Sequence, residues 1–293
     1  ELNITRAAVW KQVNELKAAG FLIESVPQKG YRLIGVPDIL EPDAIKFYSP
    51  NLLVFYEQSS VSTNLTAKAA AISGAEHGSV FVAEEQTDGR GRMGRRWISQ
   101  KNAGIYMSIV LKNIHETSRA PLATLAAALA VSDVLSEISG IDVRIKWPND
   151  ILINNKKVCG ILTEMGSCID GVEWIVVGAG INVRHSADDL GGLVDYATSL
   201  YIESGKHFSR PMIAAKLAER IMMRSEEVNA DSTKLIEEYK KRCDTLGKNV
   251  TVIDDNQKYQ AVALDIQPDG ALTVLKGSEK ITVYAGEVSI RRD

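Results

Sequence analysis

The most informative stretch of the chain is Gln86-Thr87-Asp88-Gly89-Arg90-Gly91-Arg92-Met93-Gly94-Arg95-Arg96-Trp97, in which three glycines are interleaved with four arginines. Four arginines and one aspartate give this stretch a charge of +3, in a chain whose formal net charge is −3. Glycine lets the backbone take positive φ and approach a ligand closely. Arginine presents a fixed fork of donors that matches carboxylate and phosphate oxygens. The stretch therefore predicts a loop that clamps an anionic ligand; a solvated basic loop and a nucleic-acid contact are the alternatives.

The bulk composition is that of an ordinary globular protein. The 293 residues suffice for roughly two domains with room for a small third, and the chain is 45% hydrophobic and 24% charged. We find no apolar run long enough to span a bilayer and no secretory leader, so we expect a cytoplasmic protein without a membrane partner. Because the chain begins at Glu1 inside an apparent motif, we also expect the natural protein to carry residues before it.

The cysteines and the charge balance exclude further classes. Cys159, Cys168 and Cys243 are widely spaced, and neither they nor the four histidines show metal-ligand spacing. We expect reduced thiols and predict no protein-built metal site. Because the chain is slightly acidic, a nucleic-acid partner would have to use a local basic patch.

Residues 1–37 predict part of a DNA-binding module. Thr5–Gly20 reads as a helix with Thr5 as N-cap and an apolar stripe, and Phe21–Ile34 reads as a β-hairpin. A helix followed by a hairpin is the second half of a winged helix-turn-helix, whose helix enters the major groove and whose wing meets phosphate. The candidate DNA-binding residues are Arg6, Lys11, Gln12 and Lys29. The alternative is a small helix and hairpin that only pack against the next domain.

The rest of the chain predicts an α+β domain followed by a small β-barrel. Residues 44–245 mix strands and helices, which suggests one large mixed sheet with helices around it. Its predicted strands are 53–56, 79–84, 104–111, 143–146, 151–153, 158–165 and 174–183, and its predicted helices are 62–74, 121–139, 211–228 and 232–243. In residues 246–293, five short strands separated by turns predict an SH3-like barrel. Residues 35–42 read as a linker.

Four further clusters carry possible chemistry. Ser62-Thr63-Asn64 could simply cap a helix, or its hydroxyls and amide could bind a neutral polar group such as a ureido ring. In Lys146–Asp150, a turn at Pro148 would place the cation of Lys146 and the carboxylate of Asp150 beside one cleft. The alternative is a turn whose role is to place Trp147 in the core. In Lys156–Glu164 a lysine precedes a glycine that lets a ligand lie on the backbone, or the lysines are merely solvated. In Gly178–Asn182 two glycines leave room for a close approach or mark a bulge.

Taken together and in this order, these clusters resemble the biotin protein ligases, in the bifunctional form that is also the biotin operon repressor. The resemblance spans nearly the whole chain and is carried by Gly89–Arg95, Lys146–Asp150, Lys157–Ile161 and Gly178–Asn182. It implies a class II synthetase-like catalytic domain between a winged helix and an SH3-like domain. It also implies two steps: biotin and ATP form biotinoyl-5′-AMP with Mg²⁺, and biotin then passes to a lysine of a biotin carboxyl carrier protein. The adenylate-bound form would dimerise on operator DNA and repress transcription.

The resemblance also assigns residues by motif. The implied biotin-binding residues are Ser62, Thr63, Asn64, Gln86, Arg90, Gly91, Arg92, Lys157, Gly160, Gly178 and Ile181. The implied nucleotide-binding residues are Arg92, Arg95, Trp97, Asn149, Asp150 and Asn182. The implied catalytic residues are Lys157, Arg92 and Lys146. Met93 stands where some relatives carry another arginine, and residues 184–197 match the family's adenylate-binding loop too loosely for any contact to be carried over. The alternatives are a ligand-sensing transcription factor without catalysis and a lipoate-type ligase.

Overall fold

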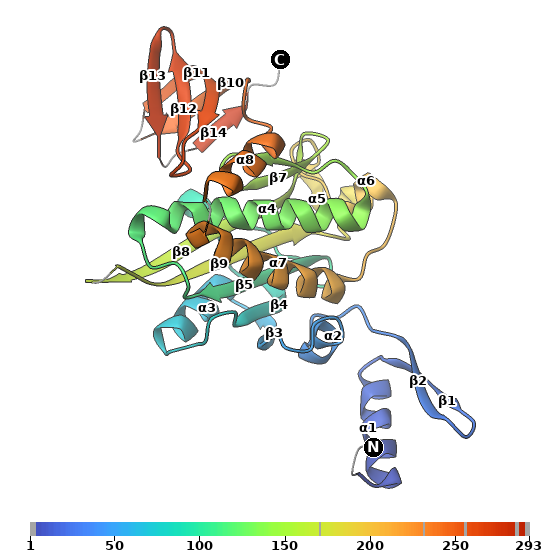
Figure 1. Ribbon diagram of the computed structural model, residues 1–293. Coiled ribbons are helices and arrows are strands. Elements are labelled where there is room, and N and C mark those ends of the chain that lie inside the picture. The colour runs from blue at the N-terminus through green and yellow to red at the C-terminus, as the bar shows by residue number, and fades with distance from the viewer. Residues whose placement is uncertain (1–3, 170, 231, 255–256, 285–286, 291–293) are drawn as a thin grey trace.

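A computed structural model of the chain describes residues 4–169, 171–230, 232–254, 257–284 and 287–290. Figure 1 shows a helix and hairpin at the N-terminal end, a central layered α+β part, and a group of short strands at the C-terminal end. This is the three-part α+β order that the sequence predicts.

The N-terminal module is one helix, α1 (Arg6–Ala18), followed by a hairpin of β1 (Leu22–Val26) and β2 (Gly30–Gly35). The Thr5 hydroxyl accepts a hydrogen bond from the backbone N–H of Ala8, which confirms Thr5 as the N-cap. The helix and hairpin of the predicted winged motif are therefore present.

The central part is built on a seven-stranded mixed sheet. Its strands are β3 (Val54–Ser60), β4 (Val80–Gln86), β5 (Gly104–Leu111), β6 (Arg144–Lys146), β7 (Asp150–Ile153), β8 (Lys156–Cys168) and β9 (Gly171–Asn182). Their order is β3-β4-β5-β9-β8-β7-β6, with β3 and β4 parallel and every other neighbouring pair antiparallel. All eight residues of β5 are buried, because this strand lies inside the sheet and is covered on both faces.

Helices cover both faces of this sheet (Figure 1). The helices of the central part are α2 (Pro42–Lys46), α3 (Thr63–Ile72), α4 (Ala120–Ser139), α5 (Ala187–Leu190), α6 (Leu200–Ser204), α7 (Arg210–Ala230) and α8 (Ser232–Arg242). Because side chains alternate along a strand, Val176 of β9 packs with α3, whereas Val177 joins the main core with α4 and α7. From Trp174 to Ile181, even-numbered residues of β9 therefore lie on the α3 side and odd-numbered residues face the main core; Val172, beyond a register shift in the β8–β9 pairing, also belongs to the main core.

The C-terminal module is antiparallel throughout, with strand order β13-β12-β11-β10-β14. The strands are β10 (Asn249–Asp254), β11 (Gln257–Ile266), β12 (Leu272–Lys276), β13 (Glu279–Val283) and β14 (Glu287–Ile290). Five short strands in residues 246–293 are what the turn pattern predicts.

Three sequence predictions need correction. Pro42 begins α2, so the linker is shorter than predicted, and residues 184–197 contain α5 as well as loop. The segment Thr117–Ser139 has the length and hydropathy of a membrane span, so the statement that no such run exists was wrong. In an apolar 18-residue window of this segment, 72% is buried inside the protein. The core helix of a globular domain passes the same test of length and apolarity.

Candidate active site

One cavity of about 570 Å³ brings together the arginine and glycine loop and the four further polar and glycine clusters of the central part. It opens on the α3 side of the sheet, between the Gly89–Arg95 loop, the Lys146–Asp150 turn and strands β8 and β9. The predicted site residues that line it are Ser62, Thr63, Asn64, Gln86, Arg90, Gly91, Arg92, Arg95, Trp97, Lys146, Asn149, Asp150, Lys157, Gly160, Gly178 and Asn182. Residues up to 120 positions apart in the sequence thus meet at one surface.

One end of the cavity is polar and rigid. Ser62 is the N-cap of α3, but its side chain makes no capping hydrogen bond. Thr63 instead donates from its backbone N–H to Gln86 Oε1 at 2.9 Å, and the Ser108 hydroxyl lies 2.8 Å from Thr63 Oγ1 and 2.7 Å from Asn64 Oδ1. The cluster does start a helix, but its buried side chains belong to a hydrogen-bonded cavity wall rather than to a cap.

Glycines make the floor of the cavity shallow. A Cβ added at Gly178 would lie 1.9 Å from Asn64 Oδ1, and one at Gly180 would lie 2.5 Å from the Trp97 ring. A Cβ at Gly160 would lie 3.0 Å from the same ring. None of the three glycines has positive φ, so they are needed for close approach rather than for a special backbone conformation.

The prediction for Ile181 was wrong. Ile181 is fully buried in the main core with Ile105 and does not line the cavity. Strand alternation explains this: Gly178 and Gly180 face the cavity, so the residue between Gly180 and Asn182 must point to the other face. Gly180, which the sequence analysis did not assign, takes the place expected for Ile181.

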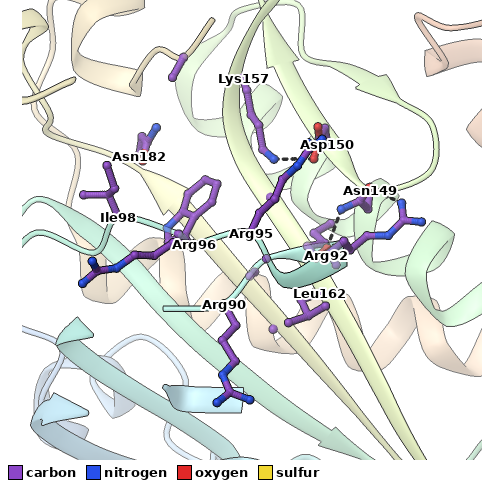
Figure 2. Close-up of a pocket in the computed structure, with 18 of the residues that line it drawn as sticks. Arg90, Arg92, Arg95, Arg96, Ile98, Asn149, Asp150, Lys157, Leu162 and Asn182 are labelled. Atoms are coloured by element: carbon purple, nitrogen blue, oxygen red, sulfur yellow. Dashed lines mark hydrogen bonds and ion pairs between the residues drawn. The ribbon is translucent and has the colours of Figure 1, made fainter. Parts of the chain in front are cut away.

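The middle of the cavity is charged. Lys157 Nζ lies 2.7 Å from Asp150 Oδ1 and 5.3 Å from the centroid of the Trp97 ring. Arg92 Nη1 donates to Asn149 Oδ1 at 2.9 Å, which fastens the arginine loop to the Lys146–Asp150 turn. Figure 2 shows both contacts, with Arg90 pointing away from the turn. A lysine, an arginine and a carboxylate thus face one space.

The Lys146–Asp150 turn is held from the C-terminal side of the chain. The buried Trp147 donates from its backbone to Thr245 Oγ1 at 2.9 Å and from its indole to the Gly270 carbonyl at 3.0 Å. The Tyr239 hydroxyl donates to the Pro148 carbonyl at 3.1 Å. Trp147 is therefore in the core, as the alternative interpretation predicted. Its hydrogen bonds also hold the next residues of the turn, Asn149 and Asp150, at the cavity.

Residues 184–197, where the resemblance implies the adenylate-binding loop, contribute to the cavity, although no contact residue was predicted there. His185, Asp189 and Tyr196 all line it. Burial lowers the pKa of His185, and hydrogen bonds from Ser186 lower the pKa of Asp189 to about 2. The usable signal was Ser186-Ala-Asp-Asp189, because Ser186 and Asp189 form a reciprocal capping box that starts α5.

The candidate DNA-binding residues lie apart from this cavity, on the N-terminal module. Arg6, Lys11 and Gln12 are exposed on α1, and Lys29 is exposed at the tip of the hairpin. Lys11 lies 3.9 Å from a carboxylate oxygen of Glu15. The four side chains are accessible to a large partner.

Comparisons with known proteins agree with this three-part organisation. The model of the Biotin/lipoate A/B protein ligase family matches residues 54–182, that of an HTH domain matches residues 1–32, and that of the Biotin protein ligase C terminal domain matches residues 245–291. The three matches fall on the central sheet, the N-terminal helix and hairpin, and the C-terminal strands.

Individual relatives cover most of the chain. The bifunctional ligase/repressor BirA of Bacillus spizizenii is 43% identical over 71% of this chain and 66% of its own length. That of Bacillus subtilis is 36% identical over 99% of this chain and 91% of its own length. A biotin protein ligase of Aquifex aeolicus, solved with biotin and ATP, is 28% identical with a TM-score of 0.70, over 82% of this chain and 99% of its own. The chain belongs to the biotin protein ligase family.

Proposed function

We propose that this protein joins biotin to ATP as biotinoyl-5′-AMP and then transfers biotin to a lysine of a biotin carrier protein. The observation that carries the proposal is that a polar end, the Lys157–Asp150 pair and the arginine loop meet in one cavity. The names of its relatives, which include ligase/repressors and a ligase solved with biotin and ATP, support the same reaction.

The first step needs two anions to approach each other. A carboxylate oxygen of biotin attacks the α-phosphorus of ATP, the bond from that phosphorus to the bridging oxygen breaks, and pyrophosphate leaves. Negative charge builds on the α-phosphate, and preorganised cations are the main means of stabilising it. We assign this role to Lys157 and Arg92, with Lys146 as a further cation on the cavity wall.

The second step needs little from the protein except exclusion of water. The uncharged amine of the carrier lysine attacks the acyl carbon, AMP leaves, and the amine loses a proton to solvent. We assign the biotin head group to the polar end formed by Ser62, Thr63, Asn64 and Gln86. The nucleotide then lies toward Trp97, with the Gly89–Arg95 loop over the adenylate.

Mg²⁺ would enter with ATP rather than occupy a site built by the protein alone. Among the residues that the structure describes, no group of three or more His, Cys, Asp or Glu side chains is placed to hold a metal ion. Mg²⁺ commonly keeps waters and takes one or two carboxylates plus substrate phosphates. Asp150 is a cavity carboxylate that fits this arrangement.

The decisive experiment measures both steps separately. Biotin-dependent exchange of labelled pyrophosphate into ATP reports the first step, and mass gain of a carrier domain reports the second. Lys157→Met should lower the exchange rate by about 100-fold or more, the size expected for a charged donor to the transition state. Lys206→Met, an exposed lysine outside the cavity, should leave it unchanged.

Two results would redirect the proposal. If the wild-type protein binds biotin but exchanges no pyrophosphate, it is a ligand sensor without catalysis. If exchange follows lipoate or octanoate instead of biotin, it is a lipoate-type ligase.

We further propose that the N-terminal module binds operator DNA and that the adenylate-bound protein represses transcription as a homodimer. The match to an HTH domain and the exposed basic residues Arg6, Lys11 and Lys29 support this. Lys29→Gln should weaken binding to duplex DNA and make the slope of log binding constant against log salt concentration shallower by about 1, because one phosphate contact is lost. Sedimentation with and without biotin plus ATP tests the dimer: a single monomeric species under both conditions would contradict it.

A further inference from the structure

The imidazole of His185 is a buried polar group that the ligation mechanism above does not use. Only 2% of His185 is exposed, it lines the cavity, and its Nδ1 atom is buried without a hydrogen-bond partner. Burying a polar atom without a partner costs free energy. A fixed residue that carries such an atom into a binding cavity is therefore a candidate for a ligand contact.

The position of His185 is set by the backbone around it. The N–H of Arg184 donates to the Ala103 carbonyl at 2.8 Å, and the Ser199 hydroxyl donates to the His185 carbonyl at 2.6 Å. These bonds tie the residue to Ala103, just before the start of β5, and to Ser199, the N-cap of α6. The backbone of His185 is thus held in place before any ligand arrives, and the residue is only 2% exposed, which limits the entropy lost on binding.

The surrounding end of the cavity suits an uncharged group. The cavity-lining residues from 182 to 197 include one charged side chain, Asp189, whose carboxylate is held by Ser186. The others there are the amide of Asn182, the imidazole, and the apolar or aromatic residues Leu190, Leu193, Tyr196 and Ala197. Trp97 Nε1, on the same cavity, is also buried without a partner. Among the described cavity-lining residues from 182 to 197 there is no lysine or arginine, and these residues offer hydrogen-bonding groups beside apolar surface.

We infer that His185 hydrogen-bonds a ribose hydroxyl of the nucleotide and so selects ribonucleotides. This inference rests on the proposed function, in which phosphate chemistry occurs at Lys157 and the nucleoside lies beyond it. A hydroxyl can both donate and accept a hydrogen bond, so it satisfies Nδ1 in either imidazole tautomer. The lowered pKa of His185 supports this, because it keeps the ring uncharged at neutral pH.

The test removes the contact from each side in turn. Affinities of ATP, 2′-deoxy-ATP and 3′-deoxy-ATP are measured by calorimetry for the wild-type protein and His185→Phe, which keeps a ring of similar size. For the wild-type protein, we expect one deoxy-nucleotide to bind about five- to thirtyfold more weakly than ATP. In His185→Phe that difference should vanish, whereas biotin affinity should stay unchanged. His207→Phe is the matched control, since His207 is exposed and only stacks on Tyr201.

The outcomes separate the inference from the proposed function. If folded His185→Phe keeps the wild-type discrimination between ATP and both deoxy-nucleotides, the ribose contact is refuted. If His185→Phe does not fold, the Nδ1 resonance of ¹⁵N-histidine in the wild-type protein decides: it should move with ATP, and no movement refutes the contact. If the wild-type protein binds no nucleotide at all, the proposed function fails and this inference fails with it.

Discussion

Gly178→Ala tests the closest approach in the proposed biotin site. Gly178 lies on β9 directly under the side-chain amide of Asn64. Its φ is not positive, so alanine meets no backbone strain there. The whole effect of the substitution is therefore the added methyl group.

The structure sets the size of that effect. The new Cβ would lie 1.9 Å from Asn64 Oδ1, and real Cβ contacts essentially never fall below 3.0 Å, so the amide must move by at least 1.1 Å. Asn64 now accepts from Ser108 at 2.7 Å, and its Nδ2 donates to the Leu162 carbonyl at 3.2 Å and to Glu164 Oε2 at 3.1 Å. Losing these three bonds costs about 3 kcal/mol of unfolding free energy. If the amide also contacts biotin, losing that hydrogen bond raises the biotin KM about fivefold or more.

Two measurements and one control decide the outcome. Thermal unfolding and the biotin KM of pyrophosphate exchange are compared between Gly178→Ala and Gly192→Ala. A Cβ at Gly192 meets no atom within 4 Å, so this variant should behave like the wild-type protein. The reasoning is refuted if Gly178→Ala has the same unfolding midpoint and the same biotin KM as the wild-type protein. The side chain of Asn64 would then not be held against β9.

Other parts of the structure give three further predictions. Arg92→Gly removes a loop-to-turn hydrogen bond and a cation, so bound adenylate should dissociate about tenfold faster or more; a parent-like rate measured by filter binding would exclude the clamp. Cys168 is exposed, whereas Cys159 and Cys243 are buried and burial raises their pKa. Because the thiolate is the reactive form, Ellman's reagent should titrate one thiol in the native protein and three in guanidinium; more than one in the native protein would contradict the burial. Arg210→Met should lower the unfolding free energy by about 3–5 kcal/mol, because it leaves the carboxylate of Glu84, 2.6 Å away, buried without its cation; urea unfolding at neutral pH measures the loss, and a change below 1 kcal/mol would be inconsistent with it.

Elements with strong local patterns were predictable. The structure gives Gly104–Leu111 the bounds that the sequence predicts, because a short, mostly apolar run between turns can be read locally. The end of α4 at Ser139 was also readable, since Gly140 adopts the left-handed conformation after it. By contrast, α2 and α6 have five residues each, too few for a helical period to be recognised.

The sequence by itself determined which chemistry the protein can do. The charged residues and glycines of the site lie in short sequence motifs, so they can be recognised before the fold is known. These motifs are the Gly89–Arg95 loop, the Lys146–Asp150 turn and the segment that begins at Lys157. Their combination is specific enough to indicate the family.

Only the tertiary structure decided which of these groups meet. The pairing of Lys157 with Asp150, the position of Gly180 rather than Ile181 in the floor, and the entry of His185 into the cavity all depend on strand register and on the path of a loop. These are set by packing between segments far apart in the chain, and a shift of one residue would reverse which face each side chain takes. The arginine loop, which indicated the family, forms a binding site only together with Lys157 of β8 and the glycines of β8 and β9 that lie beneath it.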